Sequence, residues 1–257
     1  MGLERNILMT IQYDGRKYHG WQVQQNAVTV QEVFQDAIQS VTGLRHDVKG
    51  CSRTDSGVHA FMYVLNFRTE CTIPPEKLRL AVQHFLPDDI AVLDCREVPY
   101  DFHARYACAG KEYVYKIWNS PLHNPFLKGL ALFYPYPLDE KMLNICAADY
   151  IGTHDFAAFC ASGSSVLSTV RTVTDLEVTR QGSNVTMRVR ADGFLYNMVR
   201  IMVGTLLDIS QGKIGRDEIP SILLSCDRER AGVTAPPQGL YLNRVFYPAE
   251  ALELKKD

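Results

Sequence analysis

The feature that most constrains the fold is an amphipathic helix set between strand-like segments near the start of the chain. Thr29 and Glu32 form a capping box, and the apolar residues that follow recur at three- and four-residue intervals until Gly43. A helix with one apolar stripe must bury that stripe against another element, and its strand-like neighbours make a sheet the natural partner. We therefore expect an α+β fold in which helices are layered on strands.

The first half follows the order strand, helix, strand, strand, helix, strand, which is that of a ferredoxin-like βαββαβ unit. Residues 14–22, which contain two glycines and an aromatic residue near each end, are by themselves only a connector. The predicted strands cover residues 6–13, 48–52, 60–67 and 90–98, and the second helix begins at Pro75 and ends before Pro87.

The second half repeats this order with longer connections. Residues 152–168, which include the run Ser162-Gly163-Ser164-Ser165, are rich in small polar residues and are expected to form a mobile loop. The halves 1–104 and 105–257 are predicted to form a joint mixed or antiparallel sheet with a central cleft. In the second half, strands are predicted at 105–118, 170–179, 184–191 and 240–247, and helices at about 139–150, 195–209 and 216–224.

Composition restricts the class of protein. The chain has 257 residues, of which 46% are hydrophobic and 22% charged, as in globular proteins and unlike disordered ones. Its first residues lack the pattern of a secretory signal, and its most apolar run, 198–207, is interrupted by Arg200 and too short to span a bilayer. Seven scattered cysteines without a Cys-x-x-Cys pair predict reduced thiols, a cytoplasmic location and no zinc site.

The net charge of −2 argues against a nucleic-acid-binding protein, because such proteins usually carry a basic excess. Basic residues are nevertheless concentrated in residues 103–128 and 188–216. In the strand 184–191, Thr186, Arg188 and Arg190 alternate with apolar residues, which predicts a basic face. Such patches can bind phosphate while the total charge stays negative, and two solvated charged faces are the alternative.

The segment Gly50–Ala60 carries more polar chemistry per residue than any other. Asp55 lies in a predicted tight turn, where a carboxylate packs poorly but is well placed to meet a ligand, and Arg53 lies two residues earlier. A purely structural loop is the alternative, because Asp-Ser-Gly is ordinary turn composition. Ser56 and His59 are weak evidence for a hydrolase, since triads form in space and not in sequence, and the phosphate-loop pattern is absent.

Arg200 and two tyrosines are further candidates for a site. Arg200 lies on the most apolar helix, so its guanidinium must either reach the surface or pair with a carboxylate, for which Asp55 is a candidate. Tyr113 and Tyr115 share one face of a strand. They are either core residues with tethered hydroxyls or, beside two lysines, a stacking surface for a nucleobase.

Together these residues resemble the tRNA pseudouridine synthase A family, in the family's order and over essentially the whole chain. Ser52 and Ser56 depart from the family's usual glycine and alanine, a difference that concerns the backbone of the turn and not its chemistry. The matching motifs are Tyr13-Asp14-Gly15-x-x-Tyr18-x-Gly20-Trp21-Gln22, Arg53-Thr54-Asp55-x-Gly57-Val58-His59, Phe102-His103-Ala104-Arg105, Tyr113, His154-Asp155-Phe156, Met198-Val199-Arg200 and Gly239-Leu240-Tyr241-Leu242.

The resemblance implies a pseudouridine synthase fold and a homodimer, without cofactor or metal, that converts uridine to pseudouridine at positions 38, 39 and 40 of the tRNA anticodon arm. It implies that Asp55 is the catalytic carboxylate, that Tyr113 packs on the target base and that Arg200 pairs with Asp55. Arg53 resembles the basic residue that helps to take the uridine out of the stack.

Two points stay open at the level of sequence. Asp55 could act as a nucleophile or as the base that removes a sugar proton on the way to a glycal. The competing functions are a non-catalytic RNA-binding protein, which needs no carboxylate, and a hydrolase that uses Ser56 or His59.

Overall fold

The computed structural model describes residues 4–163 and 166–254 of the chain. It divides into two compact units: unit 1 is Met1–Ala109 with Leu242–Asp257, and unit 2 is Gly110–Tyr241. The predicted α+β class with a mixed sheet is confirmed, because the described chain combines helices with antiparallel and parallel strand pairs. The predicted halves, 1–104 and 105–257, and the cleft between them stay predictions. In the part of the chain that the structure describes, no helix has both the length and the apolar character needed to cross a membrane.

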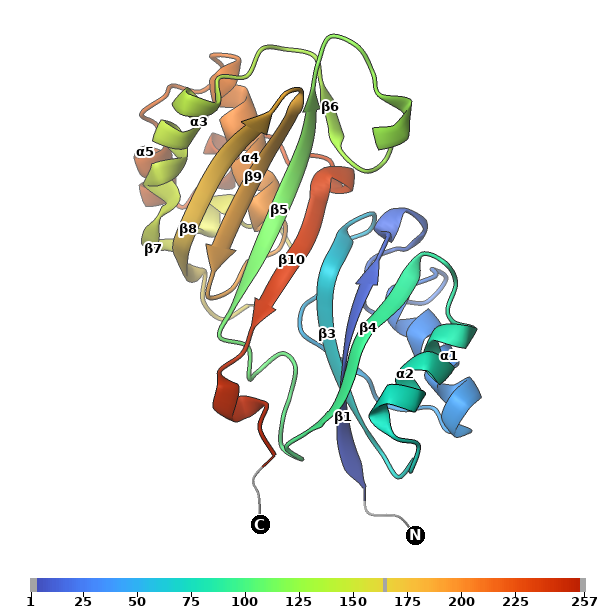
Figure 1. The fold of residues 1–257 in the computed structure, drawn as a ribbon. Coiled ribbons are helices and arrows are strands. Elements are labelled where there is room, and N and C mark those ends of the chain that lie inside the picture. Colours follow the sequence, from blue (N-terminus) through green and yellow to red (C-terminus); the bar gives the residue numbers. More distant parts are fainter. Residues whose placement is uncertain (1–3, 164–165, 255–257) are drawn as a thin grey trace. The chain divides into compact units, whose positions relative to one another are not determined.

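Unit 1 is an antiparallel sheet with two helices on one face (Figure 1). The order of its elements is the βαββαβ order that the sequence predicted. In the sheet, β1 (Arg5–Tyr13) lies between β4 (Ile90–Val98) and β3 (His59–Thr69), and the short β2 (Lys49–Gly50) pairs with β3. The helices α1 (Val30–Thr42) and α2 (Pro75–Phe85) contact each other.

The capping signals of α1 act as the sequence predicted. Thr29 Oγ1 accepts a hydrogen bond from Glu32 N (3.4 Å), and Gly43 ends the helix with a φ of +77°. Phe34 and Ile38 have no exposed surface. The apolar stripe of α1 is therefore buried in the core of unit 1.

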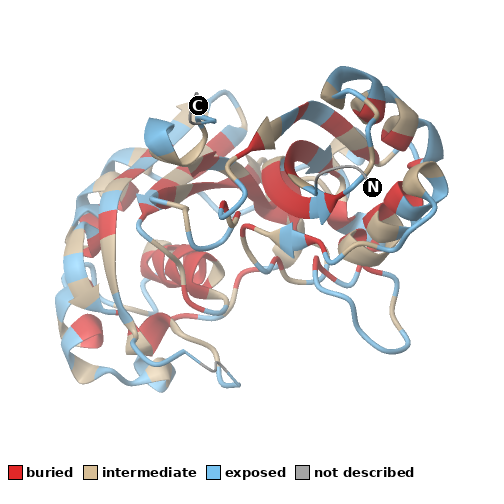
Figure 2. Ribbon diagram, turned by 90° about the horizontal axis from the view of Figure 1, so that it is seen from below, coloured by how far each residue is buried: buried red, intermediate tan, exposed pale blue. Residues whose placement is uncertain are grey.

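Among the strands of unit 2, β9 (Asn184–Ala191) lies between β5 (Gly110–Asn119) and β8 (Val170–Gln181), and both pairings are antiparallel. The helix α4 is buried along most of its length (Figure 2). The short β7 (Gly152–Asp155) pairs with β8, and β6 (Leu132–Tyr134) runs parallel to β5. The helices are α3 (Glu140–Ala147), α4 (Met198–Ser210) and α5 (Ile219–Ser225), and β10 (Leu240–Phe246) begins in unit 2 and ends in unit 1.

A side chain closes part of the edge of β8. Asn144 of α3 donates from Nδ2 to Val178 O (2.7 Å), and Val178 N donates to Asn144 Oδ1 (2.8 Å). The asparagine amide thus takes the place of a neighbouring strand and satisfies backbone groups that would otherwise be exposed for pairing with another chain.

The predicted start of β5 at Arg105 is wrong, because the strand begins at Gly110. The backbone of the preceding segment is held by buried asparagines instead of a sheet. Asn6 Nδ2 donates to Phe102 O (2.9 Å), and Ala104 N donates to the side chain of Asn66 (2.8 Å). A strand prediction from periodicity has no means of anticipating such long-range partners.

The predicted loop 152–168 is also partly wrong. Its first four residues form β7, which pairs with the beginning of β8 from Gly152↔Val173 to Asp155↔Val170. A four-residue edge strand is too short to show a reliable alternation in sequence. Ser164 and Ser165, which were expected to be mobile, lie outside the described residues.

Candidate active site

Asp55 lies in unit 1, in the connection between β2 and β3, and it is half-buried. The turn closes through Val58 N, which donates to Asp55 O (3.2 Å), and Gly57 adopts a φ of +77°. Gly57 N and Ser56 Oγ both donate to Tyr18 O, at 3.2 and 3.4 Å. These bonds fix the backbone that carries the Asp55 carboxylate.

The segment between β1 and α1 packs directly against the Asp55 turn. Trp21 N donates to Thr54 O (3.2 Å), and the hydroxyls of Tyr13 and Thr54 are hydrogen-bonded (2.8 Å). Gly20 has a φ of +84°, and a Cβ at this position would lie only 2.3 Å from Thr54 O. The sequence indicated only a connector here. The signal for its supporting role is the glycine itself, since a glycine permits this close approach.

Gly15 and His59 also hold the Asp55 turn in place. A Cβ at Gly15 would lie 2.0 Å from Val58 O, so the two backbones are in direct contact. Gly15 N donates to His59 Nδ1 (3.1 Å), and the His59 ring is only 1% exposed. Because His59 and Ser56 both hold the loop, the two side chains that suggested a hydrolase have structural contacts that account for them.

Asp14, which directly precedes Gly15, has a pKa that is shifted by its surroundings. Partial burial raises the pKa of Asp14, but hydrogen bonds from the side chain and backbone of Arg16, together with the charge of Arg16, outweigh it, so that the pKa lies below the ordinary value. His59 Nδ1 lies 3.2 Å from Asp14 Oδ1. The carboxylate of Asp14 therefore caps the turn that supports Asp55 and stays ionised at neutral pH.

The remaining predicted site residues are distributed over both units. Arg53 is exposed in unit 1, whereas Tyr113 and Arg200 belong to unit 2. Arg200 is half-buried in the first turn of α4, where Nε donates to Ala235 O and Nη1 donates to Asn197 Oδ1, both at 2.7 Å. The guanidinium is therefore oriented by hydrogen bonds within unit 2, and it does not simply extend along the surface to solvent.

Asn197 and Ala235 are functional candidates that the sequence did not reveal. Asn197 precedes α4 with a φ of +60°, a left-handed conformation that asparagine tolerates better than most residues. Ala235 N donates to Arg200 O (3.0 Å), in addition to the bond that Ala235 O accepts. The sequence signal for Asn197 is an asparagine immediately before an apolar helix, whereas nothing in the sequence marks Ala235.

The two tyrosines of β5 differ. Tyr115 has no exposed surface, and its hydroxyl donates to Pro236 O (2.7 Å). Burial raises the pKa of Tyr115, and the charge of Arg200 acts against that shift. The Tyr113 ring is 6% exposed and contacts Phe194 edge-on, with 5.1 Å between ring centroids. Tyr115 is thus a tethered core residue, and Tyr113 stays the candidate for stacking on a base.

The predicted basic face of β9 is neutralised at Arg188. Arg188 forms ion pairs with Glu112 (3.3 Å), Glu177 (3.0 Å) and Asp175. These hydrogen bonds to acidic side chains raise the pKa of Arg188 above its ordinary value. The prediction of a basic face is therefore wrong at Arg188, because neighbouring strands supply acids that the alternation pattern of β9 does not show.

The side chains that could bind a metal ion are His, Cys, Asp and Glu. Across residues 4–163 and 166–254, no three His, Cys, Asp or Glu side chains are grouped so that they could hold a metal ion. All seven cysteines are free thiols. The chemistry that these residues can supply is acid–base or nucleophilic chemistry at a carboxylate, with arginines to bind anions and a tyrosine to pack on a ring.

Comparison with known proteins gives a consistent result. The sequence pattern of the family described as tRNA pseudouridine synthase matches residues 9–107 and 146–248. Proteins called tRNA pseudouridine synthase A are similar over 95% of this chain: one from Thermoanaerobacter sp. strain X514 is 50% identical over 243 residues, and one from Acetivibrio thermocellus is 48% identical over 243 residues. Both are covered over 100% of their own length.

Solved structures match much more weakly. A chain from the crystal structure of the archaeal box H/ACA sRNP Nop10-Cbf5 complex is 13% identical, with a TM-score of 0.36, over 77% of this chain and 41% of that chain. A similarity this low carries no information about the function of this chain.

Proposed function

We propose that this chain, which belongs to the tRNA pseudouridine synthase family, modifies positions 38, 39 and 40 of the anticodon arm with Asp55 as its catalytic carboxylate. The activity itself follows from membership: the chain isomerises uridine to pseudouridine in tRNA. In this reaction the bond between N1 and C1′ breaks, the uracil turns, and C5 bonds to C1′ while the proton on C5 is lost and N1 gains one. Nothing is oxidised or hydrolysed.

The observation that carries the assignment of Asp55 is the construction of its turn. Backbone contacts from Gly15 and Gly20 leave no room for a Cβ, and three hydrogen bonds pin residues 55–58. A catalytic group must be held in a fixed position to act on a substrate atom, and a rigid turn provides this. A solvent-facing structural loop would need no such support.

Arg200, Tyr113 and Arg53 complete the proposed site. Arg200 pairs with Asp55 and keeps it ionised, and the bonds from its guanidinium to Ala235 O and Asn197 Oδ1 support this role because they orient the group. Tyr113 packs on the target uracil. Arg53, which is exposed, helps to draw the uridine out of the stack, at a cost of a few kcal/mol that phosphate contacts and stacking offset.

The carboxylate can act by either of two routes, and an isotope separates them. As a nucleophile, Asp55 attacks C1′ and the bond between C2′ and hydrogen stays intact. As a base, it removes the C2′ proton to form a glycal. With tRNA deuterated at C2′ of the target uridine, a primary isotope effect on the single-turnover rate identifies the glycal route, and no effect identifies the nucleophilic route.

The partners and the location follow the same proposal. The substrate is the anticodon arm of tRNA, the enzyme works as a homodimer in the cytoplasm, and it needs no cofactor. Seven free thiols support a reducing compartment. The measured mass in solution, by light scattering, tests the dimer.

The function is tested by mapping pseudouridine in tRNA incubated with the purified protein. The expected result is new pseudouridine at one or more of positions 38, 39 and 40 and at no other uridine. Modification confined to another region of the tRNA would contradict the proposed positions while leaving the family's reaction intact.

A further inference from the structure

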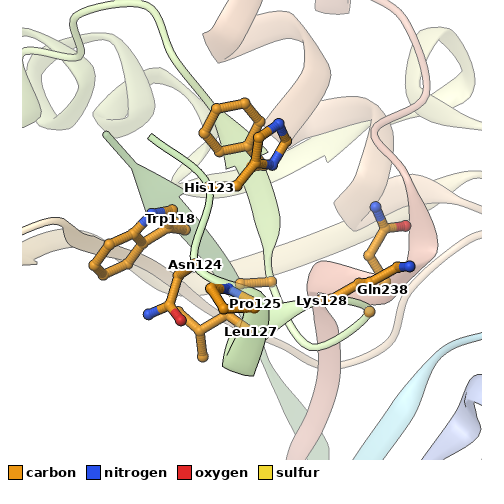
Figure 3. Close-up of a pocket in the computed structure, with 10 residues that line it drawn as sticks. Trp118, His123, Asn124, Pro125, Leu127, Lys128 and Gln238 are labelled. Carbon is orange, nitrogen blue, oxygen red and sulfur yellow. The ribbon is translucent and has the colours of Figure 1, made fainter. Parts of the chain in front are cut away.

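Unit 2 contains a pocket that none of the proposed site residues lines (Figure 3). It lies where β5 and β6, together with their connection, meet the turn that precedes β10, and its volume is about 440 Å³. This value falls within the range of roughly 300–1,000 Å³ that is usual for small-molecule sites. The pocket is thus large enough to hold a planar group such as a nucleobase.

Aromatic rings form two of its walls. Trp118, near the end of β5, donates from Nε1 to Leu122 O (2.9 Å), which fixes the indole. On another wall, His123 stacks on Phe133 of β6, with 3.7 Å between ring centroids and 30° between ring planes. Stacking between fixed aromatic rings is the usual way in which proteins hold an unpaired base.

Two amides can read the edge of a base in this pocket. Asn124 Oδ1 accepts a hydrogen bond from Phe126 N (3.0 Å), while its Nδ2 donates to no group within the described residues. Gln238 is half-buried, and its side chain makes no hydrogen bond to the described part of the chain. An amide offers both a donor and an acceptor, which is what the polar edge of a nucleobase requires.

The charge of the pocket favours a phosphate. Lys128 is exposed and lies on the side opposite Trp118 (Figure 3). Between Tyr113 and Leu138 the sequence contains two lysines and no aspartate or glutamate. Lys128 thus places a positive charge at the pocket, where it can hold the phosphate next to a bound base.

We propose that this pocket binds an unpaired nucleobase of the tRNA, other than the uridine that reacts, with the neighbouring phosphate on Lys128. The proposal rests on the proposed function in that tRNA is the substrate. The pocket increases the affinity for tRNA and fixes the position of the tRNA on the enzyme. It takes no part in the chemical step.

The affinity test compares two aromatic or imidazole residues of one loop. His123 lines the pocket, whereas Phe126 does not line it and is 88% exposed. His123→Ala should weaken binding of unmodified tRNA about 5- to 100-fold, as expected for a lost stacking contact, and should leave the single-turnover rate at saturating tRNA unchanged. Phe126→Ala should change neither quantity by more than about twofold, the scatter typical of such measurements.

A fluorescence test reports on the pocket directly. The chain has two tryptophans, and Trp21 is buried in unit 1 at 3% exposure. In a Trp21→Phe variant all tryptophan emission comes from Trp118, and saturable quenching by tRNA is expected because the base stacks near the indole. The Trp118→Phe variant, which retains Trp21, is the matched control and should lose this component of the quenching.

Three results would overturn the proposal: unquenched Trp118 emission in a protein that binds tRNA, an unchanged affinity of His123→Ala, or a shift of oligomeric state in that variant. The last result would assign the pocket to contact with a second copy of the chain. A protein that fails to bind tRNA at all would instead contradict the proposed function, so the two failures are distinguishable.

Discussion

The two units hold their proposed site residues by different physical means. In unit 1, the Asp55 turn is fixed by backbone against backbone, at positions where Gly15 and Gly20 have no room for a Cβ. In unit 2, Arg200 is oriented by side-chain hydrogen bonds to Ala235 O and Asn197 Oδ1. The difference teaches that the position of the carboxylate depends on the absence of a side chain at two glycines, whereas the orientation of the arginine depends on oxygen atoms that accept its hydrogen bonds.

Among the residues that support the site, the largest combined loss of stability and rate is expected at Gly20. Gly20→Ala places a Cβ 2.3 Å from Thr54 O and forces alanine into a φ of +84°, so the turn must move. A left-handed alanine alone costs about 1–2 kcal/mol. Displacement of the Asp55 backbone by about 1 Å should lower the rate by a further ~100-fold. Thermal melting and single-turnover pseudouridine formation measure the two losses.

Gly43→Ala is the matched control for this substitution. Gly43 has a similar φ of +77°, but a Cβ there meets nothing within 4 Å. It should reproduce the cost of the left-handed conformation and leave the rate unchanged. Equal rates for the two variants would mean that close packing at Gly20 does not position Asp55.

Arg200→Met should come next and should separate activity from stability. Two hydrogen bonds from the guanidinium are lost, which costs about 1.5–3 kcal/mol each at most. The rate should fall about 100-fold or more, since a carboxylate that loses a charged partner is less well oriented and less readily ionised. Melting and turnover are compared in the same preparation, and losses of equal size in free energy would indicate a purely structural arginine.

Substitutions at the two tyrosines of β5 should have smaller effects than Arg200→Met. Tyr113 should affect mainly the rate, and Tyr115 mainly the stability. Tyr113→Leu removes the ring that packs on the base and should cost about 10- to 100-fold in rate, from a stacking loss of about 1–3 kcal/mol. Tyr115→Phe removes only the bond to Pro236 O, so it should cost about 1 kcal/mol of stability and leave the rate within about threefold. The reverse pattern, measured by the same two assays, would exchange their roles.

The smallest effect concerns pH. The pKa of Asp14 is lowered in the folded state from the ordinary 3.8, so its contribution to stability is present above pH 3.8 and is lost as the pH falls through the lower folded value. Asp14→Asn should therefore be less stable than wild type at pH 6 by roughly a few tenths of a kcal/mol, because the group is partly exposed. The difference in melting temperature should vanish in strong acid, and a difference that persists there would exclude the ionised carboxylate as its cause.

Local signals predicted much of the fold, as α1 illustrates. The cap at Thr29, the apolar stripe and the end at Gly43 are three separate signals. Each of them involves only residues that are close to one another in the sequence. The same reasoning failed at the start of β5, where the backbone is held by Asn6 and Asn66, and at Arg188, which is neutralised from neighbouring strands. Long-range partners of this kind leave no local pattern.

In the candidate site, too, the local features could be predicted from the sequence and the long-range contacts could not. The turn at Asp55 could be read from its own residues, but its dependence on Gly15 and Gly20 could not, because close approach of two backbones is a property of the folded chain. Asn197 and Ala235 were missed for that reason, since neither carries chemistry on its own. The pairing of Asp55 with Arg200 stays a prediction.

The most direct test of the central claim is the Asp55→Asn variant, measured for both tRNA binding and single-turnover pseudouridine formation. The amide has nearly the same size as the carboxylate but is neither a nucleophile nor a base. The predicted result is tRNA affinity within a few-fold of wild type and no detectable pseudouridine. Pseudouridine formed at an undiminished rate would contradict the catalytic role of Asp55.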